Sequence, residues 1–385
     1  MVYVFVACLT YFLFSIKNKG QKICFETFKN KKFINKSSGQ LVSIIAVFLL
    51  ILFASLRAPS VGYDTPNYFE NIKRMLEYKA MRGYTYELFF QIINYIPTLI
   101  FKNLYAFNAM LFICYTIILL CVCYASKNMS KDISLTMLLF VCVDVYLRTF
   151  GQLRQGIAIA LIMVASVFAK EKRFFSFSAI IIIAMNFHKS AIIFFPVYFL
   201  SLFDKFKFKY WHYIFISIGA VFFCMFDNQI IKFVCDVLGL GYYNTYIKSG
   251  LGLQDFTIVG IIEFISIVCI FMFFLIYKIL YNKKNNVNID TDYTFYLNIL
   301  FLAIIMFFIS FALRRPALFG RLVYYYFWVL MFLVPSFLST LSNSKHKRIF
   351  KICMMGVAFA YLGFGIFMND AYGIKNYVTV FGTKL

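Results

Sequence analysis

Apolar runs of about 15–25 residues recur along the whole chain, and short polar or charged stretches separate each run from the next. Runs of this length suit helices that cross a bilayer, whereas strands of a membrane barrel would be shorter and would alternate apolar with polar residues. The pattern predicts an all-α, polytopic membrane protein that forms a single integral membrane domain over residues 1–385, with about 12 transmembrane helices. The predicted spans are 2–16, 41–56, 104–125, 133–147, 155–169, 174–187, 190–203, 211–227, 258–281, 293–312, 322–341 and 352–368.

The composition agrees with a membrane protein and excludes a soluble one. Hydrophobic residues make up 62% of the chain and charged residues 14%, which is more apolar surface than a soluble fold can bury. The net charge of +22 would also suit a nucleic-acid-binding protein, but the lysines sit in short stretches between the predicted spans. The tendency of basic residues to stay on the cytoplasmic side explains that charge, so no nucleic-acid partner is expected.

The lysine-rich stretches orient the predicted spans. All of them fall on one side of the membrane if segment 86–101, which contains Pro97, lies at the surface as an amphipathic helix and does not cross. We assign that side to the cytoplasm, which puts both ends of the chain outside together with loops at about 57–103, 228–257 and 313–321. The lysine-rich stretches are 17–40, 126–132, 170–173, 204–210, 278–292 and 342–351.

In this topology, most of the arginines lie outside the cytoplasm, whereas most of the lysines lie on the cytoplasmic side. Only two of the 22 basic residues placed inside are arginines, whereas eight of the 16 placed outside are. A guanidinium binds phosphate or carboxylate through two parallel hydrogen bonds, which an ammonium group cannot do. The outer arginines therefore predict an anion-binding site, with contact to lipid headgroups as the alternative. They are Arg57, Arg74, Arg82, Arg148, Arg154, Arg314, Arg315 and Arg321.

The segment LRAPSVGYDTPNYF, residues 56–69, follows the second predicted span. Its prolines and glycine predict a shaped loop after Arg57. Asp64 precedes Thr-Pro and could cap a short helix that begins there. The alternative is a catalytic carboxylate, which would contact a sugar hydroxyl or orient an arginine.

The segment VDVYLRTFGQLRQG, residues 143–156, holds two of the arginines together with two glutamines. Asp144 and Arg148 are four residues apart and could pair on one helical face. Arg148, Gln152 and Gln155 share a face if the helix continues, and Arg154 lies on a neighbouring one. Two guanidinium groups and two amides suit a phosphate flanked by a sugar, and a polar turn between two spans is the alternative.

Two later segments carry related groups. MNFHKSAIIFFP, residues 185–196, holds His188, whose imidazole suits a general base near pH 7, although a histidine at a membrane interface can also be structural. FALRRPALFGRLVYYYFW, residues 311–328, places aromatic side chains directly after three arginines. Among them Tyr324 could stack on a sugar ring, and an interfacial aromatic belt is the alternative. The three arginines are Arg314, Arg315 and Arg321.

The sequence gives no sign of a cofactor. It has no Walker motif and no glycine spacing of a nucleotide-binding loop, and its ten cysteines and three histidines match no metal-site spacing. Neither ATP nor a metal is therefore expected. Glu263, inside a predicted span, needs a partner or a water-lined cavity. The long loop 228–257, rich in glycine and tyrosine, could close over an external site as a lid.

These motifs together resemble the EpsG family, within the wider group of Wzy-type O-antigen and exopolysaccharide polymerases. The resemblance runs from about residue 40 to 340 and rests on the order and spacing of four motifs. They are LRAPSVGYDTPNYF, LRQGIAIAL followed by a lysine-rich turn, NFHKSAIIFFPVYFL and GRLVYYYF.

The resemblance implies a glycosyltransferase-C-like fold and a polymerase. Such an enzyme moves an undecaprenyl-diphosphate-linked glycan onto the non-reducing end of another lipid-linked repeat unit, at the outer (periplasmic) face of the bacterial inner membrane. It implies no cofactor, and a chain-length regulator and a flippase as partners. Arginines would bind the diphosphates, with His188 as first candidate base and Asp64 behind it. The matching motifs contain Arg57, Asp64, Arg154, His188 and Arg321.

Three other activities compete with the polymerase. A flippase of lipid-linked sugars would carry polar residues deep in many spans and an internal repeat, and neither is found in this sequence. An O-antigen ligase shares the chemistry and is separated only by the family resemblance. A membrane acyltransferase would also use a histidine, but the outer arginines favour phosphate over thioester chemistry.

Overall fold

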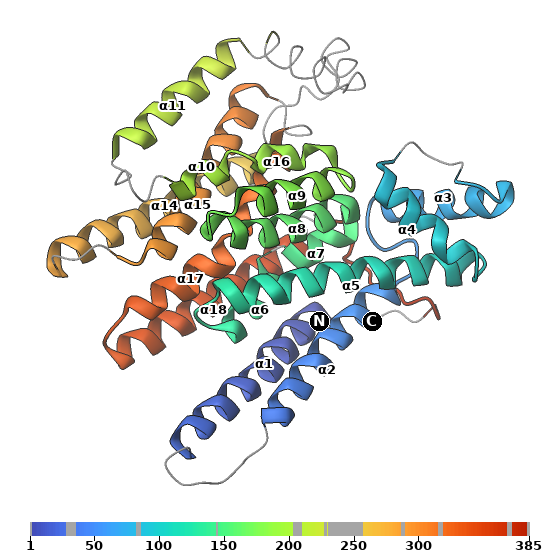
Figure 1. The fold of residues 1–385 in the computed structure, drawn as a ribbon, viewed down its shortest axis with the longest axis horizontal. Coiled ribbons are helices and arrows are strands. Elements are labelled where there is room, and N and C mark those ends of the chain that lie inside the picture. The colour runs from blue at the N-terminus through green and yellow to red at the C-terminus, as the bar shows by residue number, and fades with distance from the viewer. Residues whose placement is uncertain are drawn as a thin grey trace. The chain divides into compact units, whose positions relative to one another are not determined.

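A computed structural model describes residues 2–27, 36–81, 86–143, 145–202, 210–226, 229, 257–285, 289–314, 319–367 and 372–382. Helices form nearly all of these residues, and an isolated antiparallel bridge joins Arg57 to Thr379 (Figure 1). The chain divides into two compact units. Residues 1–195 and 330–385 form the first, and residues 196–329 form the second.

The first unit contains most of the helices. They are α1 (Val2–Thr27), α2 (Lys36–Ser55), α3 (Thr65–Tyr78), α4 (Leu88–Thr98), α5 (Asn103–Met129), α6 (Ile133–Cys142), α7 (Val145–Gly151), α8 (Leu153–Lys170), α9 (Phe174–Met185), the 3₁₀ helix η1 (Lys189–Phe194), α17 (Leu330–Thr340) and α18 (Ser344–Phe367). Its core lies around α5, α6 and α8, where nearly every apolar side chain of α6 and α8 is buried.

The second unit contains α10 (Val197–Leu202), α11 (Tyr210–Met225), α14 (Ile258–Asn285), α15 (Thr291–Ala312) and α16 (Arg321–Phe327). Aromatic side chains join α11, α14 and α15. The Tyr213 hydroxyl donates to Asn298 Oδ1 at 2.8 Å, and the Tyr293 hydroxyl donates to the carbonyl of Phe274 at 2.8 Å. These bonds satisfy polar groups that would otherwise face hydrocarbon.

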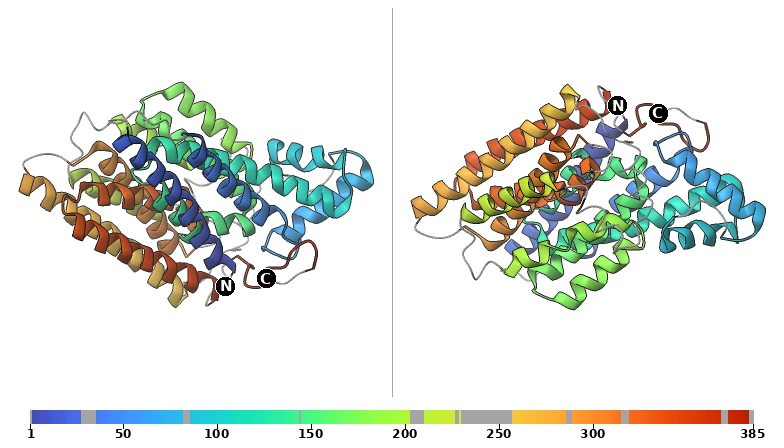
Figure 2. Two further views of the ribbon diagram at one scale, coloured as in Figure 1. Left: turned by 90° about the horizontal axis from the view of Figure 1, so that it is seen from below. Right: turned by 90° about the horizontal axis from the view of Figure 1, so that it is seen from above.

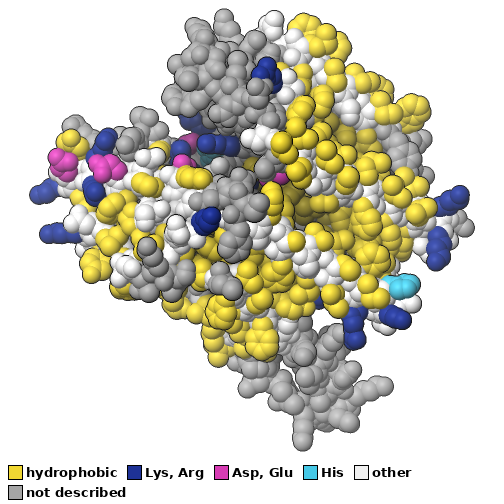
Figure 3. Space-filling model, turned by 180° about the vertical axis from the view of Figure 1, so that it is seen from behind, with side chains coloured by type: hydrophobic (Ala, Val, Ile, Leu, Met, Phe, Trp, Pro, Cys, Tyr) yellow, Lys and Arg dark blue, Asp and Glu magenta, His cyan; other side chains and the backbone are white. Residues whose placement is uncertain are grey.

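Seven helices of the described residues are long and apolar enough to cross a membrane: Asn103–Met129, Ile133–Gly151, Leu153–Lys170, Gly260–Asn285, Thr291–Ala312, Arg321–Thr340 and Ser344–Ile366. Five shorter apolar helices accompany them. Hydrophobic side chains cover much of the face that Figure 3 draws, and many large hydrophobic side chains are exposed. The chain is therefore an all-helical membrane protein, while the number of twelve spans and the glycosyltransferase-C-like fold stay predictions.

The chain between α2 and α5 begins and ends at the same end of the first unit. The Asn108 amide, near the start of α5, donates to the carbonyls of Ser55 and Arg57 at the end of α2. Helices α3 and α4 lie between these points in the sequence and beside α5 in space (Figure 1). The ring of Phe69 of α3 packs against that of Phe107 of α5. Whether segment 86–101 crosses a membrane stays a prediction.

Antiparallel helices give the first unit two chemically different ends. The lysine-rich turns after α5 and α8 lie at one end, where Lys351 Nζ of α18 pairs with Asp132 Oδ2 at 2.6 Å. The other end holds α3, α4, the α7–α8 turn and the α9–η1 turn, and it is called the arginine end here because Arg57, Arg148 and Arg154 lie there. The separation of lysine turns from these arginines matches the sorting expected from the sequence.

A C-terminal segment, residues 372–382, closes the arginine end. Its backbone exchanges hydrogen bonds with the loop after α2: Val380 N–H donates to the Leu56 carbonyl at 2.7 Å, and Ala58 N–H donates to the Val378 carbonyl at 2.9 Å. The Tyr3 hydroxyl of α1 donates to the Ile374 carbonyl at 2.6 Å. The N-terminus and this segment therefore lie side by side (Figures 1 and 2).

Candidate active site

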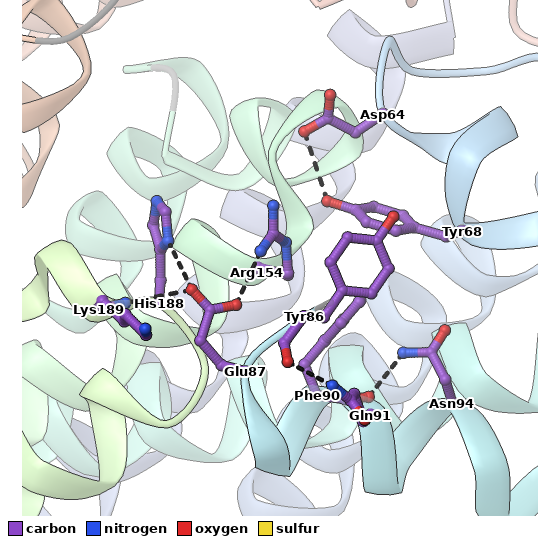
Figure 4. Close-up of polar contacts among 10 residues, drawn as sticks. All are labelled: Asp64, Tyr68, Tyr86, Glu87, Phe90, Gln91, Asn94, Arg154, His188 and Lys189. Atoms are coloured by element: carbon purple, nitrogen blue, oxygen red, sulfur yellow. Dashed lines mark hydrogen bonds and ion pairs between the residues drawn. The ribbon is translucent and has the colours of Figure 1, made fainter. Parts of the chain in front are cut away.

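A partly buried carboxylate joins three distant segments at the arginine end. Glu87 Oε2 accepts a hydrogen bond from Arg154 Nη1 at 2.7 Å, and Glu87 Oε1 lies 3.4 Å from His188 Nδ1 (Figure 4). Oε1 also accepts from the backbone N–H of Lys189 at 3.3 Å. The exposed fractions of the Glu87, His188 and Arg154 side chains are 11%, 19% and 25%, so the group is sheltered but reachable.

Each member of this group sits where a helix begins or ends. Glu87 occupies the N-cap position of α4 with extended backbone, and its side chain makes no capping bond to its own helix. Arg154 lies in the first turn of α8, directly after the break at Gln152. His188, also extended, precedes η1. A hydrogen bond of 3.2 Å from Phe89 N–H to the Asn186 carbonyl fixes the start of α4 against the end of α9.

The carboxylate of Glu87 is ionised at neutral pH. Burial raises its pKa, but the hydrogen bond with His188 and the charge of Arg154 outweigh burial and lower the pKa to about 2. An ionised carboxylate accepts hydrogen bonds only, so it favours the imidazole tautomer that carries its proton on Nδ1. That tautomer leaves the lone pair of Nε2 available to accept a proton.

Aromatic rings form one wall of the site. The Arg154 guanidinium lies 4.5 Å from the centre of the Tyr86 ring, in a cation–π contact. Tyr68 packs edge-on against Tyr86 and Phe90, with ring centres 5.8 and 5.1 Å apart. Burial raises the pKa of Tyr68, so its hydroxyl stays protonated and acts as a hydrogen-bond donor beside Arg154.

Asp64 is connected to the site through Tyr68. Its Oδ2 accepts from the Tyr68 hydroxyl at 3.4 Å (Figure 4). Asp64 occupies the N-cap position of α3, but its side chain makes no capping hydrogen bond. The helix-capping alternative is therefore not what the structure shows, and Asp64 faces the aromatic wall beside Arg154.

Arg57 and Arg148 are held by protein groups. Arg57 is completely buried; its Nη1 donates to the Ala54 carbonyl and to the Tyr115 hydroxyl, both at 2.8 Å, and its guanidinium lies 4.4 Å from the Phe150 ring centre. Arg148 is 7% exposed, and its Nη2 donates to the Tyr372 hydroxyl at 2.6 Å. The structure thus brings Arg154, but neither of these two arginines, into contact with Glu87. Diphosphate binding by Arg57 and Arg148 stays a prediction.

The two glutamines flank Arg154. Gln152 occupies the N-cap position of α8 without making a capping bond, and its buried Oε1 makes no hydrogen bond in the described structure. Gln155 is buried at 3% exposure. Both lie at the start of the helix that carries Arg154, and their predicted contact with sugar is untested.

Other predicted site residues lie in the second unit, which is described by itself. Arg314 and Arg321 are exposed, and the partly exposed ring of Tyr324 contacts Phe327. Glu263 is partly buried on α14. Arg315, Asp144 and all but Gln229 and Thr257 of the loop 228–257 fall outside the described residues. Among the described residues, no three His, Cys, Asp or Glu side chains cluster as metal ligands.

Sequence reasoning missed Glu87. It is one of sixteen acidic residues and lies outside all the quoted motifs, 101 residues from His188 and 67 from Arg154. The sequence did contain one signal for Glu87. This residue lies at the start of segment 86–101, which the positions of the lysine-rich stretches predict to be an amphipathic helix at the membrane surface. A lone carboxylate at the start of such a segment faces the same end as the arginines.

Comparison with known proteins gives one match. The sequence model of the EpsG family matches residues 40–379, a range that contains Glu87, Arg154, His188 and most of the C-terminal segment. No curated protein and no solved structure matches the chain.

Proposed function

The chain belongs to the EpsG family, and we propose that it is a glycosyltransferase that polymerises lipid-linked oligosaccharide repeat units. The donor is a glycan on undecaprenyl diphosphate, and the acceptor is a hydroxyl at the non-reducing end of a second lipid-linked repeat unit. The acceptor oxygen forms a bond to the anomeric carbon of the donor. The bond from that carbon to the diphosphate breaks, and undecaprenyl diphosphate leaves with the electron pair.

His188 is the proposed general base. Its Nδ1 faces the Glu87 carboxylate at 3.4 Å, and this contact favours the tautomer in which Nε2 accepts the proton of the attacking hydroxyl. The ionised carboxylate stabilises the imidazolium that results, as a buried acid does for histidine in other enzymes. The proton then passes to water. Asp64, beside Tyr68, is the second candidate base.

Arg154 is the proposed ligand of the departing diphosphate. Before reaction the charges of Arg154 and Glu87 cancel while His188 is neutral, so the group carries no net charge. Once His188 has taken the acceptor proton, the group carries one positive charge, and the leaving diphosphate gains negative charge in the same step. The positive charge of the group therefore appears as the negative charge of the leaving diphosphate develops. Stabilisation that arises in the transition state lowers the barrier to transfer, whereas equal stabilisation of the bound substrate would only tighten its binding.

The proposed location is the outer face of a bacterial inner membrane. The Glu87 group lies at the arginine end of the first unit, opposite the lysine-rich turns that the positive-inside tendency assigns to the cytoplasm. Lipid-linked substrates would reach this end with their polyprenyl chains in the bilayer. The contact of Glu87 with both Arg154 and His188, inside the matched range, is the observation that carries the proposal.

The test is glycan length in cells that lack the gene and carry wild type or His188→Ala. His346→Ala is the matched control, because His346 is an exposed histidine at the first turn of α18. We expect wild type and the control to restore a ladder of repeats and His188→Ala to leave single-repeat product, with all three proteins present in the membrane. Loss of even the single-repeat product in the deletion strain would contradict the proposal and favour a flippase. A full ladder in the deletion strain, with no polymer joined to its final acceptor, would favour a ligase.

A further inference from the structure

Tyr372 contacts both segments that support the candidate active site. Its hydroxyl accepts from Arg148 Nη2 at 2.6 Å, and its ring lies 4.8 Å from the Arg148 guanidinium. Its carbonyl accepts from Tyr63 N–H, directly before Asp64, at 3.1 Å. Tyr372 is 5% exposed, so these contacts are sheltered from solvent.

The backbone of α7 also approaches Tyr372 closely. A Cβ added at Gly151 would lie 3.2 Å from the Tyr372 carbonyl oxygen and 3.3 Å from its Cβ, which is tighter than ordinary packing. Gly151 ends α7, and Arg154 follows it by three residues. Tyr372 therefore touches the loop that ends in Asp64 and the turn that presents Arg154.

These two segments must keep a fixed spacing for the site to form. Asp64 and Tyr68, joined by a hydrogen bond of 3.4 Å, belong to the first segment, and the Tyr68 hydroxyl lies beside the Arg154 guanidinium of the second. A shift of one segment relative to the other by a fraction of an ångström would move the Tyr68 hydroxyl away from the Arg154 guanidinium, and misplacement by about 1 Å can cost a hundredfold in rate.

We propose that Tyr372 is a positioning residue for glycan transfer, acting through Arg148 on α7 and through the backbone of the loop 57–64. This inference rests on the proposed function. It assigns Arg148 to the support of the site, because a buried guanidinium that donates to Tyr372 holds α7 against the C-terminal segment. The EpsG match extends to residue 379 and so includes this segment.

The experiment uses the full-length protein in proteoliposomes, with lipid extract from the deletion strain as the source of lipid-linked repeat units. The initial rate of polymer formation is measured against the amount of extract for wild type, Tyr372→Phe, Arg148→Ala and the double variant. Tyr377→Phe is the matched control, because Tyr377 lies in the same segment but its hydroxyl donates to the Phe53 carbonyl of α2. Thermal stability of each variant is recorded in detergent.

We expect Tyr372→Phe to lower the maximal rate about 10- to 100-fold, with half-saturation within about twofold of wild type. The double variant should be no slower than the slower single variant, because both changes remove one contact. Tyr377→Phe should keep the wild-type rate. Should Tyr372→Phe fail to reach the membrane, Arg148→Lys tests the same contact. We expect this variant to lose maximal rate with half-saturation unchanged, because a lysine ammonium does not reproduce the planar guanidinium that both donates to the Tyr372 hydroxyl and lies over its ring.

Three results would overturn the inference. The first is a Tyr372→Phe rate within about twofold of wild type. The second is a loss of rate in Tyr372→Phe that is matched by equal losses of rate and thermal stability in Tyr377→Phe. The third is an Arg148→Lys variant that changes half-saturation alone, which would make Arg148 a direct ligand of the diphosphate. If wild type forms no polymer from the extract, the proposed function itself fails, which is a separate and recognisable outcome.

Discussion

Glu87 and Arg154, 67 residues apart in the sequence, form a 2.7 Å ion pair at the arginine end, and the second oxygen of the same carboxylate faces His188. One side chain thus sets both the tautomer of the candidate base and the position of the candidate diphosphate ligand. Breaking a sheltered pair of this kind leaves a charge without its partner, so single substitutions should have large effects.

Glu87→Gln should lower polymer formation about 100-fold or more. The amide has one accepting oxygen where the structure needs two, so its NH₂ group must face either Arg154 or Nδ1 of His188. Initial rates in proteoliposomes measure the effect. Glu70→Gln is the matched control, because Glu70 is an exposed glutamate on α3 that pairs only at the surface with Lys73 and Arg74. Equal losses in the two variants would contradict a special role for Glu87.

Acidification should destabilise wild type through Glu87. Its pKa falls from an ordinary 4.5 to about 2 in the folded protein, so its contribution to stability is complete above about pH 4.5 and is lost as the pH falls through 2. That contribution is on the order of 3 kcal/mol. Glu87→Gln should be less stable than wild type at pH 7 and lose less on acidification. Thermal midpoints in detergent at pH 7, 4 and 3 measure both, and parallel curves for the two proteins would argue against the Glu87–Arg154 ion pair.

Arg154→Lys should shorten the glycan ladder and slow polymer formation about 10- to 100-fold. Lysine keeps the charge but can hold either Glu87 or a diphosphate oxygen, whereas the guanidinium can reach both at once. Arg173→Lys provides the comparison, because Arg173 is exposed in the lysine-rich turn after α8. Full ladders from both variants would leave the polymerase proposal standing and remove Arg154 from its mechanism.

Gly62→Ala should destabilise the protein by about 2–4 kcal/mol. Gly62 has φ of +103°, and an added Cβ would lie 2.0 Å from the backbone carbonyl oxygen of Phe150. Thermal midpoints and membrane yield measure the loss. Gly356→Ala, on α18 with open space around the added methyl group, should be neutral or slightly stabilising. If Gly62→Ala behaves like Gly356→Ala, the close approach of the loop to α7 is wrong.

Much of the fold follows from the sequence because hydrophobic runs and loop charge are local signals. They predict the all-helical membrane protein and a segment 86–101 that does not cross. They also predict the sorting of lysine turns from arginines in the first unit. Arg154 and His188 were found for the same reason, since each lies at a helix end within a polar motif. The described structure brings both residues into contact with Glu87 but tests none of their roles.

The parts of the fold and of the candidate site that the sequence does not predict depend on contacts between distant residues. Arg57 and Arg154 look alike in the sequence, yet one is completely buried against Tyr115 and the other is partly exposed beside Glu87. No pattern distinguishes them, because the difference lies in which helix packs over each. Asp64 has the sequence of a helix cap, but the hydroxyl of Tyr68, one turn later, faces its carboxylate instead.

The contact between Tyr3 and Ile374 spans 371 residues, and the backbone bonds of Leu56, Ala58 and Gly62 to the C-terminal segment span over 300. The ribosome makes residues 372–382 only after every helix of both units has been synthesised. Until then, those backbone groups of the loop lack their final partners. The arginine end of the first unit therefore gains its final backbone hydrogen bonds only late, when these last described residues have been made.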